Sequence, residues 1–212
     1  MELNLAAIFI AFLVLLFSLS VHESAHAWAA WRLGDPTGRL LGRVSLNPLV
    51  HLDLVGSLLL PLLTMWTPVG AFGFAKPVPV DTRRLKDPRR DFMTIAAAGP
   101  LSNLALALSG ALAYQVVVLV PAAIGAVNIS GPLGRVAYEA ISINIALFLI
   151  NIIPIPPLDG GTVLAGLLPD RLAVAFANLR PFGFIILYAL VLTGAFMKLV
   201  GPPYHLLLSW LL

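Results

Sequence analysis

The sequence has no cysteine and very little charge. Disulfide bonds and thiol chemistry are therefore excluded, and any bound metal must be held by His, Asp or Glu side chains. Only 11% of the 212 residues are charged, whereas 59% are hydrophobic, and the mean hydropathy is +0.96. A soluble domain carries about 25% charged residues, and a core of this length cannot bury so much apolar surface. These values predict an integral membrane protein.

Backbone inside a lipid bilayer must be helical unless protein shields it, so we expect an all-α polytopic membrane protein. With shorter embedded pieces, the apolar pattern predicts about four to six transmembrane helices. The runs long enough to span lie at residues 3–33, 92–120, 135–153 and 182–200.

One transmembrane domain is expected over residues 1–212, with its core at roughly 4–170 and a C-terminal transmembrane region at 171–212. The N-terminus lacks the basic region and the cleavage site of a signal peptide, so we expect it to be retained in the first span. The net charge is only +3, and no nucleic-acid signature is present. The lipid bilayer is therefore the expected environment, without a nucleic-acid partner.

Basic residues are concentrated in two loops, at residues 34–50 and 67–91. Short loops rich in Lys and Arg stay in the cytoplasm, and only the apolar segment 51–66 separates these two loops. If this segment crossed the bilayer, one basic loop would lie outside. We therefore expect a segment that is re-entrant or lies along the interface, with a short tilted span as the alternative. The uncharged loop 121–134 is then external.

The strongest chemical motif is H-E-x-x-H at residues 22–26, near the end of the first predicted span. Residues four apart share one helix face, so His22 and His26 can bind one zinc ion. Glu23 lies beside them and can act as the base that activates water. Polar residues packed at a helix end are the alternative, but ionisable groups inside membrane helices are costly and usually functional.

A catalytic zinc site needs a third protein ligand. Asp159 is a candidate because it lies at a similar depth to His22, toward the cytoplasmic ends of two spans that run in the same direction. Capping of a helix that begins at Gly160 is an alternative role for this carboxylate. The remaining candidates are Glu139, His51, Asp53 and His205.

The two strongest motifs together resemble the site-2 protease family of intramembrane zinc metalloproteases. That family pairs H-E-x-x-H on one transmembrane helix with N-x-x-P-x-P-x-L-D-G on another, and residues 151–160 read N-I-I-P-I-P-P-L-D-G. Shorter similar segments extend the resemblance to roughly residues 5–170, most like compact bacterial members: G-D at 34–35, G-R at 42–43, L-N-P at 46–48, H-L-D at 51–53, A-K-P-V-P-V at 75–80 and A-G-P-L-S-N at 98–103.

The resemblance implies that Asp159 is the third ligand of one Zn²⁺ per chain, beside His22 and His26, with Glu23 as the catalytic base. It implies a zinc metalloendopeptidase that cleaves transmembrane segments of membrane proteins in regulated intramembrane proteolysis. The expected location is the bacterial cell (inner) membrane, with the active site toward the cytoplasm. Some relatives carry a PDZ or CBS domain, and the loop 121–134 is too short to hold either.

Three further residues are candidates for binding the oxyanion or the substrate: Asn151, Asn103 and His51. Amide side chains can donate hydrogen bonds without titrating, although contacts between helices are their ordinary role in membranes. Residues 73–80, G-F-A-K-P-V-P-V, are expected to form a small membrane-associated β element that binds unwound substrate by strand addition. An ordinary loop is the alternative.

Other functional classes fit less well. A membrane zinc peptidase of the prenyl-protein type takes its third ligand from a downstream Glu, and Glu139 is expected at the external side instead. A catalytically inactive scaffold that binds transmembrane helices would be expected to have lost Glu23 or a ligand. A metal transporter would show further ionisable residues along a path, and the other spans are nearly bare.

Overall fold

The computed structural model describes residues 5–64, 75–119 and 131–212. In this part of the chain every regular element is helical, and four helices are long and apolar enough to cross a membrane. The prediction of an all-α polytopic membrane protein is confirmed for these residues. The four candidate spans are Leu5–Arg32, Pro88–Val118, Pro132–Ile152 and Asp170–Leu192.

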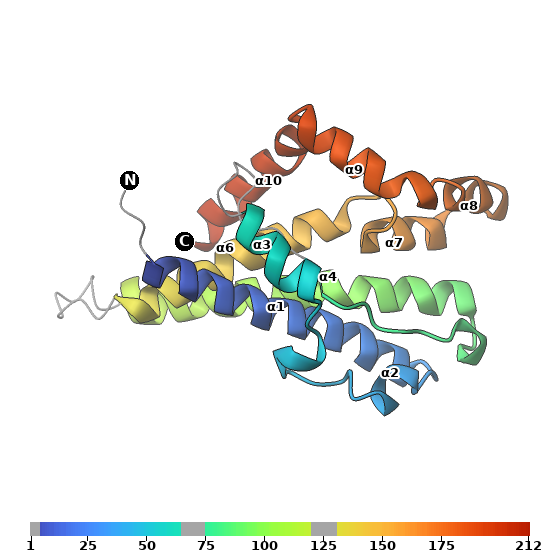
Figure 1. The fold of residues 1–212 in the computed structure, drawn as a ribbon, viewed down its shortest axis with the longest axis horizontal. Coiled ribbons are helices and arrows are strands. Elements are labelled where there is room, and N and C mark those ends of the chain that lie inside the picture. Colours follow the sequence, from blue (N-terminus) through green and yellow to red (C-terminus); the bar gives the residue numbers. More distant parts are fainter. Residues whose placement is uncertain (1–4, 65–74, 120–130) are drawn as a thin grey trace.

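Three helices form the centre of the molecule: α1 (Leu5–Arg32), α4 (Pro88–Tyr114) and α6 (Pro132–Ile152). α4 contacts both others and also α7 (Asp159–Leu167), and a π-helical turn, η4 (Gln115–Leu119), continues it (Figure 1). Buried alanines of α4 pack against isoleucines of α6, an arrangement in which small side chains let membrane helices approach closely.

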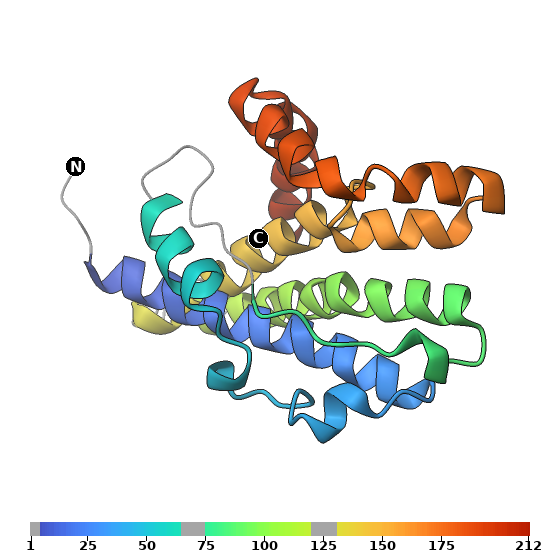
Figure 2. The ribbon, with the colours of Figure 1, turned by 45° about the vertical axis from the view of Figure 1, so that its right-hand side comes forward.

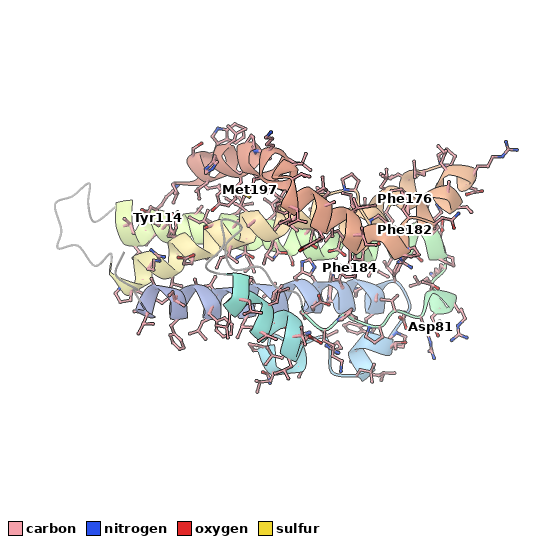
Figure 3. All side chains as sticks on the ribbon, turned by 45° about the horizontal axis from the view of Figure 1, so that its top comes forward. Asp81, Tyr114, Phe176, Phe182, Phe184 and Met197 are labelled. Atoms are coloured by element: carbon pink, nitrogen blue, oxygen red, sulfur yellow. The ribbon has the colours of Figure 1, made fainter. Side chains whose placement is uncertain are left out.

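The loops at the end of α1 and at the start of α4 are tied together. They carry α2 (Thr37–Leu40), η1 (Pro48–Val50) and η3 (Thr82–Arg84). The fully buried Asp35 carboxylate accepts hydrogen bonds from the backbone N–H groups of Thr37 (3.0 Å) and Asp81 (2.7 Å). Asp81 and Tyr114 lie at opposite ends of the long axis (Figure 3). The parts of the two basic loops around Asp35 and Asp81 therefore lie at the same end of the bundle.

The predicted re-entrant segment 51–66 is described up to residue 64. It forms a π-helix, η2 (Leu54–Leu59), followed by α3 (Leu60–Thr64). Asp53 caps η2 by accepting from the N–H groups of Val55 (3.0 Å) and Gly56 (2.8 Å). The path that follows, residues 65–74, lies outside the described residues, so the re-entrant course remains a prediction.

The predicted β element is not confirmed. Gly73 and Phe74 lie outside the described residues, and residues 75–80 are extended without forming a β-strand. One backbone hydrogen bond joins the Lys76 N–H to the His51 carbonyl (2.9 Å). Pro77 and Pro79 have no N–H to donate, which explains why no ladder continues from this bond.

The C-terminal third differs from the expected span at 182–200. The fourth candidate span combines α8 (Asp170–Ala177), η5 (Arg180–Phe182) and α9 (Gly183–Leu192). At φ +70°, Gly194 adopts a left-handed conformation that favours glycine, and the chain turns there into α10 (Ala195–Leu211). α9 and α10 meet at an apex away from α1 and α4 (Figures 1 and 2).

The apolar tail 201–212, which is too short to cross the bilayer alone, forms the second half of α10. Four of its side chains pack against the core between α4 and α6: Tyr204, Leu207, Leu208 and Leu211. The predicted span 182–200 therefore runs across the turn at Gly194. Hydropathy does not reveal this turn, because a lone glycine between two apolar runs gives no signal.

Candidate metal centre

The H-E-x-x-H motif lies in the second half of α1 and directs two imidazoles to the same place. His22 and His26 are one helical turn apart, and their Nε2 atoms are separated by 3.0 Å. Their rings are nearly perpendicular, with centroids 4.6 Å apart. The predicted sharing of one helix face is confirmed.

α7 brings Asp159 to the same point from the other end of the sequence. Its Oδ2 atom lies 3.1 Å from His22 Nε2 and 3.4 Å from His26 Nε2. Asp159 is the first residue of α7, and the cap position is occupied by Leu158 without a side-chain cap. The alternative role of this carboxylate as a helix cap is thus not observed.

A glycine is required immediately after Asp159. A Cβ on Gly160 would lie 2.2 Å from the carbonyl oxygen of Ile152, at the end of α6. Only a residue without a side chain lets α7 begin so close to α6, and this approach carries Asp159 to the histidines.

The hydrogen bonds at the far side of each imidazole set the position of its proton. His26 Nδ1 lies 2.7 Å from the backbone carbonyl of Ile95, which can only accept. His22 Nδ1 lies 2.7 Å from Oδ1 of Asn103. When both Nδ1 atoms donate, both Nε2 atoms present lone pairs toward Asp159.

These contacts fit a metal ion. Asp159 Oδ2 is buried and has no hydrogen-bond partner among the described residues. Two lone pairs and a carboxylate oxygen at 3.0–3.4 Å repel one another unless a cation lies between them. A tetrahedral zinc with ligands at about 2.0–2.1 Å separates them by about 3.3 Å, close to the observed spacing.

Glu23 is half-buried beside this group and interacts electrostatically with His26. Within the described part of the chain its carboxylate takes part in no hydrogen bond. It is therefore available to accept a proton from a water molecule at the site.

α4 closes one side of the group with Gly99. A Cβ at this position would lie 2.4 Å from His26 Nε2 and 2.6 Å from His22 Cε1. Contacts this short cannot be accommodated, so any side chain here displaces the imidazoles.

We expect Gly99→Ala to lower the affinity for zinc by more than about 10-fold because the added methyl group pushes both ligands out of position. Competition with a chelator for zinc measures this affinity on the protein in detergent. Gly201→Ala is the control, since it adds the same methyl group to a helix at a place where no other atom lies within 4 Å. A Gly99→Ala protein that binds zinc as tightly as Gly201→Ala would contradict the expectation.

The other candidates for the third ligand lie outside the group that could hold a metal, which in the described residues consists of His22, His26 and Asp159. Glu139 forms the expected ion pair with Arg135, at 2.6 Å. Asp53 is the cap of η2 described above, and His205 packs edge-on against Tyr204.

The three candidates for oxyanion or substrate binding occupy different places. Asn103 contacts His22, as described above. Asn151 donates to the Leu147 carbonyl of its own helix, at 2.9 Å. His51 is buried in the loop before η2, where its Nε2 donates to the Ser45 carbonyl at 2.9 Å.

Sequence reasoning missed two buried polar residues that extend the contact between Asn103 and His22. Asn144 of α6 accepts from Asn103 at 2.9 Å and donates to Ser18 of α1 at 2.9 Å. An uncharged polar residue within an apolar run is a weak signal, because such residues commonly bond to their own helix.

Comparison with known proteins found similar chains that are named as zinc metalloproteases. "Putative zinc metalloprotease YwhC" of Bacillus subtilis (strain 168) is 35% identical over 187 residues, covering 85% of this chain and 79% of that protein. "Putative zinc metalloprotease Rip2" of Mycolicibacterium smegmatis is 33% identical over 181 residues, or 85% of this chain and 65% of that protein.

The protein of the same name from Mycobacterium tuberculosis (strain H37Rv) is 33% identical over 178 residues, or 84% of this chain and 64% of the relative. The chain thus spans just under two thirds of the length of the mycobacterial relatives. No family model matches the sequence. No solved structure matches the fold.

Proposed function

The chain belongs to the site-2 protease family of zinc metalloproteases, and we propose that it is an intramembrane zinc metalloendopeptidase. It hydrolyses peptide bonds within or near the transmembrane segments of membrane proteins, as in regulated intramembrane proteolysis. The observation that carries this proposal is the convergence of His22, His26 and Asp159 at 3.0–3.4 Å on helices that belong to a membrane bundle.

These three side chains would hold one zinc ion per chain and leave a fourth position for a reactant. When bound, zinc would supply Lewis acidity at the scissile carbonyl and would make an attacking water more acidic. Glu23 accepts the proton of this water and later delivers it to the leaving amine. Asn103 serves this chemistry through His22, whereas Asn151 remains a candidate donor to the oxyanion.

A substrate helix must unwind before its peptide bonds can be attacked, because its own hydrogen bonds protect them. The extended conformation of residues 75–80 favours this segment as the place where the unwound substrate binds. Ala75 is buried against Leu15 and Leu19 of α1, which also carries the H-E-x-x-H motif. We propose that the unwound substrate pairs with this segment as an added strand, beside a re-entrant segment at 51–66.

The orientation in the membrane follows from the loops. The basic residues of 34–50 and 67–91 favour the cytoplasmic side of a bacterial cell membrane for the end of the bundle that carries Asp81. The metal ligands lie toward the same end of α1, so the active site is assigned to the cytoplasmic half of the bilayer. The partners are membrane protein substrates and the surrounding lipid.

Newly formed N-termini in cell membranes test this activity without knowledge of the substrate. Membranes from cells that produce the wild-type chain are compared with membranes from cells that produce Glu23→Gln. We expect new peptide N-termini inside transmembrane segments with the wild type alone, and their loss when a zinc chelator is added. A wild-type protein that binds zinc but generates no such N-termini would instead support the helix-binding scaffold.

A further inference from the structure

A buried row of polar side chains connects His22 to the backbone of α6. Starting from His22 Nδ1, it passes through Asn103 of α4 and Asn144 of α6 and ends at two acceptors, the Ala140 carbonyl and the Ser18 hydroxyl. The distances along it are 2.7, 2.9, 2.8 and 2.9 Å. Asn103 is 0% exposed, and Asn144 and Ser18 are each 1% exposed.

The direction of every hydrogen bond in this row follows from one backbone group. A carbonyl only accepts, so the amide NH₂ of Asn144 must face Ala140, and its Oδ1 must face Asn103. The NH₂ of Asn103 must then donate to Asn144, which leaves Oδ1 of Asn103 facing His22. His22 Nδ1 is therefore the protonated nitrogen, and Nε2 carries the lone pair that a metal requires.

The reversed arrangement is a real competitor. If both amides turned over, the NH₂ of Asn103 would face His22 Nδ1, and the proton of the imidazole would move to Nε2. That proton could then bond to Oδ2 of Asp159, which lies 3.1 Å away, and the metal position would be closed. Only the oxygen–oxygen repulsion between Asn144 and the Ala140 carbonyl opposes this state, because amide oxygens cannot donate.

The two histidines differ in how they are held. His26 Nδ1 faces the backbone carbonyl of Ile95, which cannot turn over. His22 faces an amide that presents either an acceptor or a donor, depending on its orientation. His22 therefore needs a second residue that fixes the orientation of Asn103, and Asn144 is the residue that contacts Asn103.

We propose that Asn144, acting through Asn103, is a positioning residue that keeps His22 in the Nδ1-protonated tautomer and so keeps the site able to bind its metal. This inference rests on the proposed function, because it concerns the ligands of the same zinc. Ser18 contacts Asn144 from one turn before His22 on α1. Its hydroxyl holds the amide in place without selecting its orientation, because a hydroxyl donates as well as accepts, so it has a smaller effect than the Ala140 carbonyl.

The tautomer of His22 is measured directly by ¹⁵N NMR of the metal-free protein with labelled histidine, at a pH high enough that both imidazoles are neutral. The chain has four histidines, so the signal of His22 is assigned by comparison with a His22→Gln variant. We expect Nδ1–H in the wild type and a shift toward Nε2–H in Asn144→Leu, where the amide of Asn103 is free to turn. An unchanged Nδ1–H tautomer in a folded Asn144→Leu protein would overturn the proposal.

Zinc affinity gives a second readout, measured by competition with a chelator. Partners of metal-bound histidines typically contribute about 10–100-fold to affinity, so we expect a loss of this size in Asn144→Leu and in Asn103→Leu. Asn103→Asp should retain most of the affinity, because one oxygen of its buried carboxyl accepts from Nδ1 and the other, when protonated, donates to Asn144 Oδ1. Ser18→Ala should lose less than Asn144→Leu.

Ser142→Ala is the matched control. It removes a hydrogen bond of 2.7 Å between α6 and Tyr204 of α10, two residues from Asn144, without contact to the row. If Ser142→Ala weakens zinc binding as much as Asn144→Leu, or if Asn103→Asp binds as poorly as Asn103→Leu, the role is only structural and the proposal fails. A wild-type protein without zinc would defeat the proposed function itself, which is a different result.

Discussion

Glu23→Gln is expected to abolish peptide hydrolysis while zinc remains bound. Glutamine keeps the shape of the side chain but cannot take up a proton, so the attacking water loses its base. General acid–base catalysis contributes about 10²–10⁴-fold, and we expect the cleavage rate to fall by this factor. The zinc content of the purified variant should equal that of the wild type, because Glu23 is outside the group of three converging ligands.

The rate is measured in proteoliposomes with a transmembrane peptide identified from the new N-termini described above. Glu139→Gln is the matched control, since it makes the same change at a buried Glu whose partner is Arg135. Its activity should stay close to that of the wild type. A Glu23→Gln enzyme that retains full activity would exclude Glu23 as the base and leave the metal group without its assigned proton acceptor.

Asp159→Ala is expected to remove zinc from the purified protein. The substitution deletes one of three converging ligands, so we expect a loss of affinity beyond the about 100-fold attributed to outer partners. The substitution removes no helix cap, because the cap position of α7 is Leu158 and no side chain caps the helix there, so the metal-free variant should remain folded. Zinc should therefore raise the melting temperature of the wild type and leave that of Asp159→Ala unchanged.

Metal analysis and thermal unfolding with and without added zinc measure both effects. Asp170→Ala serves as the control, because it removes an exposed Asp from the next helix, where it pairs with Arg89. Stoichiometric zinc in Asp159→Ala would move the third ligand elsewhere. A wild type whose melting temperature ignores zinc would contradict the metal site as a whole.

The sequence by itself determined the class of the protein and two of the three members of the metal group. The apolar composition requires the bilayer and therefore helices. Within lipid, a helix satisfies all the hydrogen bonds of the backbone inside one segment. The pairing of His22 with His26 is equally local, because a spacing of four residues places two side chains on one face of any helix. Asp159 was indicated by depth and by the resemblance of residues 151–160 to a known motif.

Only the tertiary structure decided what surrounds these ligands. The contact of Asn103 with Asn144 joins residues 41 positions apart, and that of Asn144 with Ser18 joins residues 126 apart, so both depend on how three helices are aligned. The close approach of Gly99 to both imidazoles and the break at Gly194 have the same origin. Helix register between distant segments has no period in the sequence, and it is this register that sets the tautomer of His22.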